Sequence, residues 1–160
     1  MRLARVLLCA TIGSVPAHAQ ATLDAGVKPE LRLDAITAHS VTVLQVGGGV
    51  EIPAGYYARV GVIGAVGAPV STGANGINGR LDVIGRFLFD PFREHPWGLS
   101  AGAGVSLRAA AHDKVRPYLA TVLDLEGPRR ASGLAPAVQV GLGGGVRVGA
   151  ALRWGGTVSR

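Results

Sequence analysis

Two short pairs of residues are of the types that carry out nucleophilic catalysis. His39-Ser40 and His112-Asp113 would together supply a hydroxyl nucleophile, an imidazole base and a carboxylate that orients the base. Residues of these types are also common in turns, where they bond to the local backbone. The glycine runs 47–49 and 143–145 lack the Lys-Ser/Thr of a phosphate-binding loop, and no metal-ligand spacing is present. We therefore predict no catalytic residue, no metal and no cofactor.

The basic residues raise the question of a nucleic-acid partner. The chain has 160 residues, a formal net charge of +6 and a pI near 10.4. Its arginines, however, stand singly within apolar segments, and Arg129-Arg130 is the only adjacent basic pair. Nucleic-acid sites concentrate positive charge in a patch and add aromatic side chains for stacking, whereas aromatic residues make up only 5% of this chain. We therefore exclude nucleic acid as a partner.

The first residues have the layout of a secretory signal peptide. Arg2 and Arg5 precede an apolar run over 6–15, and Ala17-His18-Ala19 forms an A-x-A cleavage site. We predict that 1–19 is a cleaved signal peptide and that 20–160 is a single exported domain. The only cysteine, Cys9, falls within the signal peptide, so a disulfide cannot hold the mature chain together.

The remaining sequence consists of short alternating segments. Nearly half of the residues (48%) are hydrophobic, and no stretch after residue 19 approaches the ~18 consecutive apolar residues of a transmembrane helix. Apolar residues instead alternate with polar or small ones at a period of two, which predicts strands. The eight segments are 31–37, 41–52, 56–66, 80–90, 97–108, 115–126, 134–142 and 146–154. The glycine-rich segment 67–79 is predicted to be the longest loop.

The contents of the two faces predict which face points outward. On 97–108 the second face carries Gly, Ser, Gly, Gly, Ser and Arg, and such small residues would weaken a strand exposed to water. Inside a narrow eight-stranded barrel, they would leave room for long side chains from neighbouring strands. Because an isolated buried ion is costly, we predict a paired network of charges that plugs the lumen. Its predicted members are Arg59, Arg80, Asp82, Arg86, Asp90, Arg108, Arg116, Asp124, Glu126, Arg147 and Arg153, with Glu51 as a further acidic partner.

The last of the eight segments carries a more specific pattern. In 146–154, V-R-V-G-A-A-L-R-W, a polar residue, a glycine, a hydrophobic residue and an aromatic residue stand at fixed spacing, as Arg147, Gly149, Leu152 and Trp154. This pattern resembles the insertion motif in the last strand of bacterial outer-membrane β-barrels. In that family the aromatic residue usually ends the chain, whereas here 155–160 follow. With the signal peptide and the strands of bilayer length, the chain is similar to the small eight-stranded barrels of the OmpA/OmpX type.

The resemblance implies an all-β fold, a single antiparallel up-and-down transmembrane β-barrel in the bacterial outer membrane. It further implies contact with outer-membrane lipid and lipopolysaccharide, insertion by the barrel-assembly machinery, and long external loops opposite short periplasmic turns. Aromatic girdles are also expected, and their candidates are Tyr56, Tyr57, Phe87, Phe89, Trp97, Tyr118 and Trp154. Such a protein, with its lumen plugged, would not be an open pore. It would have a structural role or bind an unknown external partner through its loops.

Two alternatives stay open. A soluble periplasmic or secreted β-barrel would turn its apolar face inward around an apolar ligand. An outer-membrane enzyme that modifies lipid A would use His, Ser and a carboxylate on the external rim, where His39-Ser40 and His112-Asp113 are predicted to lie. The sequence leaves open the biological role, the oligomeric state, and whether 31–37 pairs with the last strand to close the barrel.

Overall fold

Eight strands make up the fold. The computed structural model describes residues 26–71, 73, 75–91, 94–110 and 114–155. The predicted signal peptide, 1–19, and the pair His112-Asp113 lie outside these residues. No helix within the described ranges has the length and hydrophobicity needed to cross a membrane. The strands are β1 (Lys28–Ala38), β2 (Val41–Pro53), β3 (Ala58–Pro69), β4 (Asn78–Leu88), β5 (Gly98–Ala110), β6 (Arg116–Glu126), β7 (Leu134–Leu142) and β8 (Val146–Trp154).

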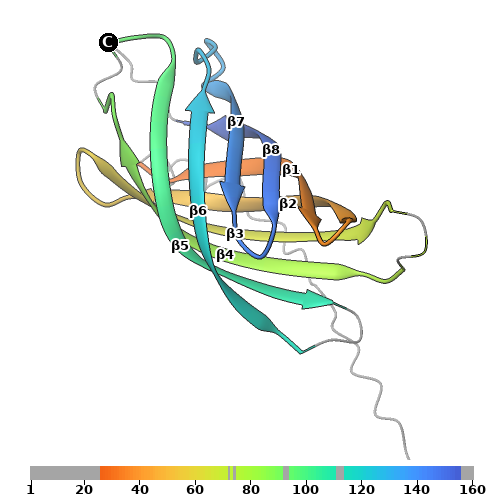
Figure 1. The fold of residues 1–160 in the computed structure, drawn as a ribbon. Helices are drawn as coiled ribbons and strands as arrows, with labels where there is room; N and C mark the ends of the chain where they lie inside the picture. The colour runs from red at the N-terminus through yellow and green to blue at the C-terminus, as the bar shows by residue number, and fades with distance from the viewer. Residues whose placement is uncertain (1–25, 72, 74, 92–93, 111–113, 156–160) are drawn as a thin grey trace, which may run out of the picture.

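The strands form one closed antiparallel barrel in which each strand pairs with its neighbours in the sequence (Figure 1). Closure is made by β1 and β8, whose register runs from Glu30 opposite Arg153 to Thr37 opposite Val146. The predicted all-β, up-and-down antiparallel architecture is therefore confirmed. The pairing of the first strand with the last, which the sequence left open, is present.

Two differences from the predicted segments flank the predicted loop 67–79. β3 continues to Pro69 and β4 begins at Asn78, so the connection shortens to 70–77. Glycine favours loops in a local analysis, but Gly67 lies in β3 opposite Gln45. An added Cβ at Gly67 would collide with the carbonyl of Leu44 on the adjacent strand. This glycine therefore marks a close approach of two strands rather than a loop.

The connections at the two ends of the barrel differ from the expected pattern. We call the end that holds the described chain termini the near end and the opposite end the far end. The near end has the connections 54–57, 89–97 and 127–133, and the far end has 39–40, 70–77, 111–115 and 143–145. The expected contrast of short near-end turns and long far-end loops is wrong, since 89–97 is the longest connection. The far-end connections are short because β3, β4 and β5 extend into segments predicted as loops.

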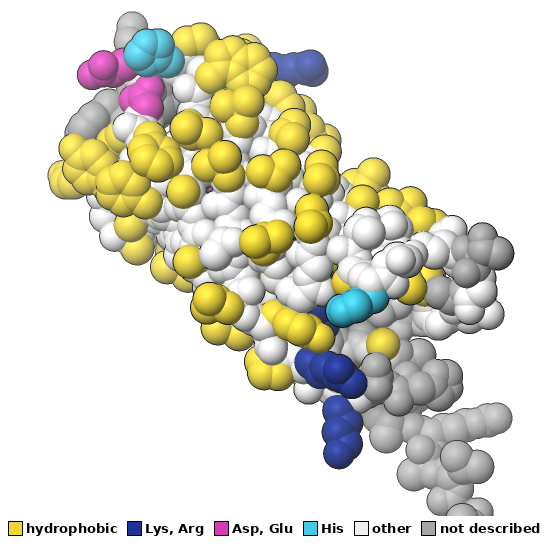
Figure 2. Space-filling view, viewed as in Figure 1, with side chains coloured by type: hydrophobic (Ala, Val, Ile, Leu, Met, Phe, Trp, Pro, Cys, Tyr) yellow, Lys and Arg dark blue, Asp and Glu magenta, His cyan; other side chains and the backbone are white. Residues whose placement is uncertain are grey.

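The two faces of the strands have opposite chemistry. Outward positions on the eight strands hold Val, Leu, Ile, Ala, Gly, Pro, Phe, Trp or Thr, and none of them holds a charged residue. On the side shown in Figure 2, apolar side chains cover the wall and charged ones gather at the ends. Inward positions carry the buried Arg, Asp and Glu side chains. The barrel thus has a polar interior and an apolar exterior, the reverse of a soluble protein.

The close packing of strands inside the barrel yields a prediction at Gly104 of β5. An added Cβ there would collide with the carbonyl of Val83 and lie 2.8 Å from Cα of Ile84. Gly104→Ala should lower the free energy of unfolding by about 1–3 kcal/mol, the usual cost of overpacking an interior. The measurement is the urea midpoint of the protein in detergent micelles.

The matched control is Gly85→Ala on the paired strand β4. Gly85 faces outward, and an added Cβ would approach no closer than 3.8 Å, to the carbonyl oxygen of Ala103. Its midpoint should stay at the wild-type value or rise slightly. Equal midpoints for the two variants would contradict the close approach at Gly104.

Candidate functional site

The inward side chains form a charged network along the barrel axis. At the near end, Arg153 of β8 donates from Nη1 and Nη2 to the two carboxylate oxygens of Asp124, at 2.7 and 2.6 Å. Its Nε donates to Glu30 of β1 at 2.9 Å. Arg86 of β4 pairs with Glu51 of β2 and also lies 3.8 Å from Glu30. Strands that are not neighbours in the barrel, such as β6 and β8, are therefore joined by charge-assisted hydrogen bonds, which are stronger than neutral ones.

A second group of charges occupies the far half of the network. Arg32 of β1 donates from Nε and Nη2 to the two carboxylate oxygens of Asp34, at 2.8 and 2.7 Å. Arg80 of β4 pairs with Asp34 and lies 3.1 Å from Asp82. Arg147 of β8 donates to Asp82 at 2.6 Å. β1, β4 and β8 are thus tied together across the lumen.

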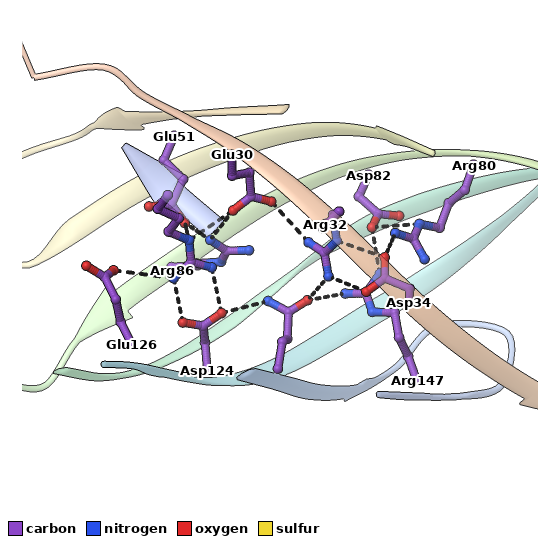
Figure 3. A network of polar contacts seen from close by, with 12 residues as sticks. Glu30, Arg32, Asp34, Glu51, Arg80, Asp82, Arg86, Asp124, Glu126 and Arg147 are labelled. Atoms are coloured by element: carbon purple, nitrogen blue, oxygen red, sulfur yellow. Dashed lines mark hydrogen bonds and ion pairs between the residues drawn. The ribbon is translucent and has the colours of Figure 1, made fainter. Parts of the chain in front are cut away.

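Gln139 of β7 joins the two groups. Its Nε2 donates to Asp124 at 3.1 Å, and its Oε1 accepts from Arg32 at 2.7 Å and from Arg147 at 3.1 Å. Figure 3 shows the resulting chain, with Glu51, Glu126 and Arg86 toward one end and Arg80, Asp82 and Arg147 toward the other. An amide suits this position because it can donate to a carboxylate and accept from arginines at the same time.

The strand residues of the network are balanced in charge. Its near-end edge is formed by Arg59, 3.3 Å from Glu51, and by Arg129, 3.4 Å from Glu126. Arg129 stands in the connection 127–133, and its partial burial lowers the pKa of its guanidinium. Within the strands, six arginines face six carboxylates: Arg32, Arg59, Arg80, Arg86, Arg147 and Arg153 against Glu30, Asp34, Glu51, Asp82, Asp124 and Glu126.

Small residues on the neighbouring strands make room for these long side chains. An added Cβ at Gly102 of β5 would lie 2.9 Å from Cγ of Arg86 and would collide with the carbonyl of Gly85. At Gly149 of β8 it would collide with Oδ1 of Asp34. The lumen therefore fits its charged side chains only because these inward positions carry no side chain.

Most of the predicted lumen residues come together in this network, but three lie elsewhere. Asp90 follows β4 and accepts hydrogen bonds from the backbone N–H groups of Glu94 and His95, at 3.1 and 3.0 Å. Arg116 is exposed at the start of β6 on the far rim. Arg108 reaches the far mouth, where it donates to the carbonyl of Gly144 at 2.9 Å. Alternation predicts the face of a strand on which a residue lies, but not its position along the barrel axis. The sequence therefore predicts these three residues deeper in the lumen than the structure places them.

Four members of the network were not predicted. Glu30, Arg32 and Asp34 lie on β1, and Gln139 lies on β7. Their burial, at 0–3% exposure, equals that of the predicted members. The signal that identifies them is the same alternation, since Glu30, Arg32 and Asp34 share one parity with alternating Leu31 and Leu33. Their partners across the barrel depend on the strand register and on the closure of the barrel. A local sequence pattern gives no information on either.

The four residues of the insertion pattern divide between the two faces of β8. Arg147 and Gly149 face the lumen, Leu152 faces outward at 42% exposure, and Trp154 is half-buried at the near end. Gly149 therefore has a packing role against Asp34 in addition to any role in assembly.

Of the two pairs considered for catalysis, the structure describes His39-Ser40, which forms a hairpin turn. His39 and Ser40 form the two-residue connection between β1 and β2, with φ of 46° and 69°. Positive φ at both positions is typical of the type I′ turn that matches the twist of a hairpin. No group of three or more His, Cys, Asp or Glu within the described ranges is placed to hold a metal ion. The chemistry available in the lumen is therefore ion pairing and hydrogen bonding.

Comparisons with known proteins agree with this architecture. No family model and no curated protein sequence matches the chain. Among solved structures, the crystal structure of Neisserial surface protein A (NspA) is similar, with a TM-score of 0.57 and 11% sequence identity. The match covers 80% of this chain and 94% of that one. The chain has the fold of the small eight-stranded β-barrels. At this identity the likeness concerns the fold alone.

The ion pairs of Arg153 predict a large loss of stability when this residue is replaced. Arg153→Met would leave Asp124 and Glu30 without their main cationic partner. Breaking one side of a buried ion pair typically costs about 3–5 kcal/mol. We expect a correspondingly lower urea midpoint in micelles.

The control for this variant is Arg130→Met, which removes the same charge from an exposed position in the near-end connection 127–133. Its midpoint should change little. If Arg153→Met unfolds at the same urea concentration as the wild type, the ion pairs do not hold the barrel together.

Proposed function

We propose that the chain is a small integral β-barrel of the bacterial outer membrane, with a side-chain-filled lumen and a structural or loop-mediated interaction role. The observation that carries the proposal is the outward face of the barrel. Its strands, of 9–13 residues, present no charged side chain there, and about 9–11 tilted residues suffice to cross a bilayer core. Large side chains such as Leu33, Val46 and Leu119 are 59–78% exposed.

The same observation disfavours a soluble barrel around an apolar ligand. Such a protein would need its apolar face inside and polar residues outside. Here the lumen carries ion pairs, and an apolar exterior of this extent in water would be a strong aggregation site. Lipid is the solvent that suits this apolar exterior, and closure pairs most of the backbone N–H and C=O groups between strands, as a bilayer requires.

Aromatic side chains support a membrane boundary at the near end. Tyr57 stacks on Phe87 with ring centres 5.9 Å apart, and Phe87 meets Phe89 edge-on at 5.8 Å. Trp97 is 55% exposed and Trp154 lies on the outer face of β8 at the same end. Such residues favour the interface between hydrocarbon and water. Tyr118 is different from the other girdle candidates, because it faces the far mouth of the lumen next to Arg108.

The cellular location rests on two sequence features and the fold. The basic, apolar and A-x-A layout of 1–19 suits export. The pattern Arg147, Gly149, Leu152 and Trp154 suits recognition by the barrel-assembly machinery, and the outer face would then contact lipid and lipopolysaccharide. The near end would lie on the periplasmic side. The paired charges of the lumen suit a structural or loop-mediated role.

Membrane insertion can be tested with a charge on the outer wall. Val83, in the middle of β4, is 47% exposed and faces outward. Val83→Lys should oppose insertion by about 2–4 kcal/mol if this position meets the bilayer midplane. We expect less heat-modifiable protein in the outer-membrane fraction than for the wild type. The control is Ile77→Lys, at an exposed position in the far-end connection 70–77, which should insert normally.

Electrical recordings test the filled lumen. Charged side chains with 0–5% exposure fill its near and middle parts, so the protein reconstituted in a planar bilayer should show no steady, large conductance. Insertion is verified in parallel by protease protection. A steady conductance of the size of a water-filled porin would contradict the plugged lumen.

A further inference from the structure

A cavity of about 390 Å³ opens at the far mouth of the barrel, beyond the charged network. Its walls come from the far ends of β1, β2, β4, β5 and β6 and from the β7–β8 hairpin. Apolar residues such as Ile36 and Val43 line one part of it, and Gln45, Arg108, Lys114 and other polar residues line the rest. The lumen is thus filled by its own side chains in the near and middle parts and hollow at one mouth.

The cavity carries positive charge that the described residues do not neutralise. The lumen network is balanced, with six arginines and six carboxylates, and Arg108 lies outside it. Arg108 and Lys114 form no ion pair with any described residue, and no Asp or Glu is among the described residues that line the cavity. On the side shown in Figure 2, the charged side chains at the far end are Lys or Arg and the acidic ones lie at the near end.

Arg108 is held in place before any ligand arrives. Its guanidinium carbon lies 5.8 Å from the ring centre of Tyr118, and its Nη1 donates to the carbonyl of Gly144 at 2.9 Å. The ring contact restricts the orientation of the guanidinium plane. The backbone contact uses one of five N–H donors, so the fork keeps donors for an anion.

Gln45 provides a second, independent feature of the cavity. Its side chain is 3% exposed, and its Oε1 accepts no hydrogen bond within the described part of the chain. A buried acceptor without a partner is costly, which makes it a place where a donor is expected. The hydroxyl of a singly protonated phosphate group would be such a donor, while its anionic oxygens would face Arg108 and Lys114.

The cavity adjoins a groove on the outer wall, with which it shares lining residues. The β7–β8 hairpin is short, so residues 116–120 of β6 extend past the first β6–β7 pair, Thr121 and Leu142. An apolar groove lies at this notch, lined by outward residues such as Leu119, Leu142 and Val146, and it shares His39 and Gly144 with the cavity. A phosphate could therefore arrive free along the barrel axis or on a lipid headgroup through the notch.

We propose that the far-mouth cavity is a binding site for a phosphate group, held by Arg108 and Lys114 with Gln45 as the acceptor for its hydroxyl. Arginine and lysine are the side chains that proteins use most for phosphate, the first as a fork of donors and the second as a point charge. This site goes beyond the structural role proposed above and does not depend on it.

The test is calorimetric titration of the full chain in a non-ionic maltoside detergent at low ionic strength. Inorganic phosphate is the free probe, and phosphatidic acid added to the micelles, against phosphatidylcholine, is the lipid probe. We expect saturable binding of at least one phosphate probe, weakened about tenfold or more by Arg108→Gln and by Lys114→Gln. Added salt should weaken the same binding.

Arg130→Gln at the near end is the matched control, because it removes one positive charge from an exposed position away from the cavity. Heat-modifiable mobility on unboiled gels verifies that each variant is folded. Binding of phosphatidic acid alone assigns the site to a lipid headgroup, and binding of inorganic phosphate assigns it to a free anion. The proposal is overturned if neither probe binds saturably, or if Arg130→Gln weakens binding as much as the two cavity variants.

Discussion

The barrel depends on the pairing of charges in its lumen. A soluble protein gains most of its stability by burying apolar side chains, but here those side chains face outward. The interior is held instead by directed contacts such as those of Arg153 with Asp124 and Glu30. Because an unpaired buried ion costs several kcal/mol, each member needs the others in place. The near and far groups meet at Gln139, so the interior behaves as one connected unit.

Pairing in so narrow a space also restricts the size of the neighbouring residues. Gly102 gives room to Arg86, and Gly149 gives room to the carboxylate of Asp34. Fully buried Ile63 and Ile84 fill further space in the lumen. Gly47, Gly49 and Gly104 likewise lie at inward positions where an added Cβ would collide with the backbone of an adjacent strand.

The sequence predicts the strands and their inward faces well, because both follow from a local period of two. Alternation places Arg80, Asp82 and Arg147 inside, and the structure brings them together. The depth of a side chain in the lumen and the identity of its ion-pair partner depend on residues far away in the sequence. Arg116 has lumen parity but stands at the exposed end of β6, and Gln139 becomes the link only once β7 lies beside β8 and across from β1. Glycine and proline at the end of β3 predict a loop, while strand pairing gives Gly67 a place in the barrel.

The charged lumen also specifies the register of the strands. A slip of one residue turns every inward side chain of a strand outward. For β8 such a slip would turn Arg147 and Arg153 to the apolar outer face and leave Asp82 and Asp124 without these partners. Apolar residues alone would tolerate slips of two residues, but the pairing of Arg153 with Asp124 and of Gly149 with Asp34 would not. The ion pairs and the close packing inside the lumen therefore account for the spacing of Arg147 and Gly149. Leu152 and Trp154, which face outward, are the residues of the pattern whose role the interior does not explain.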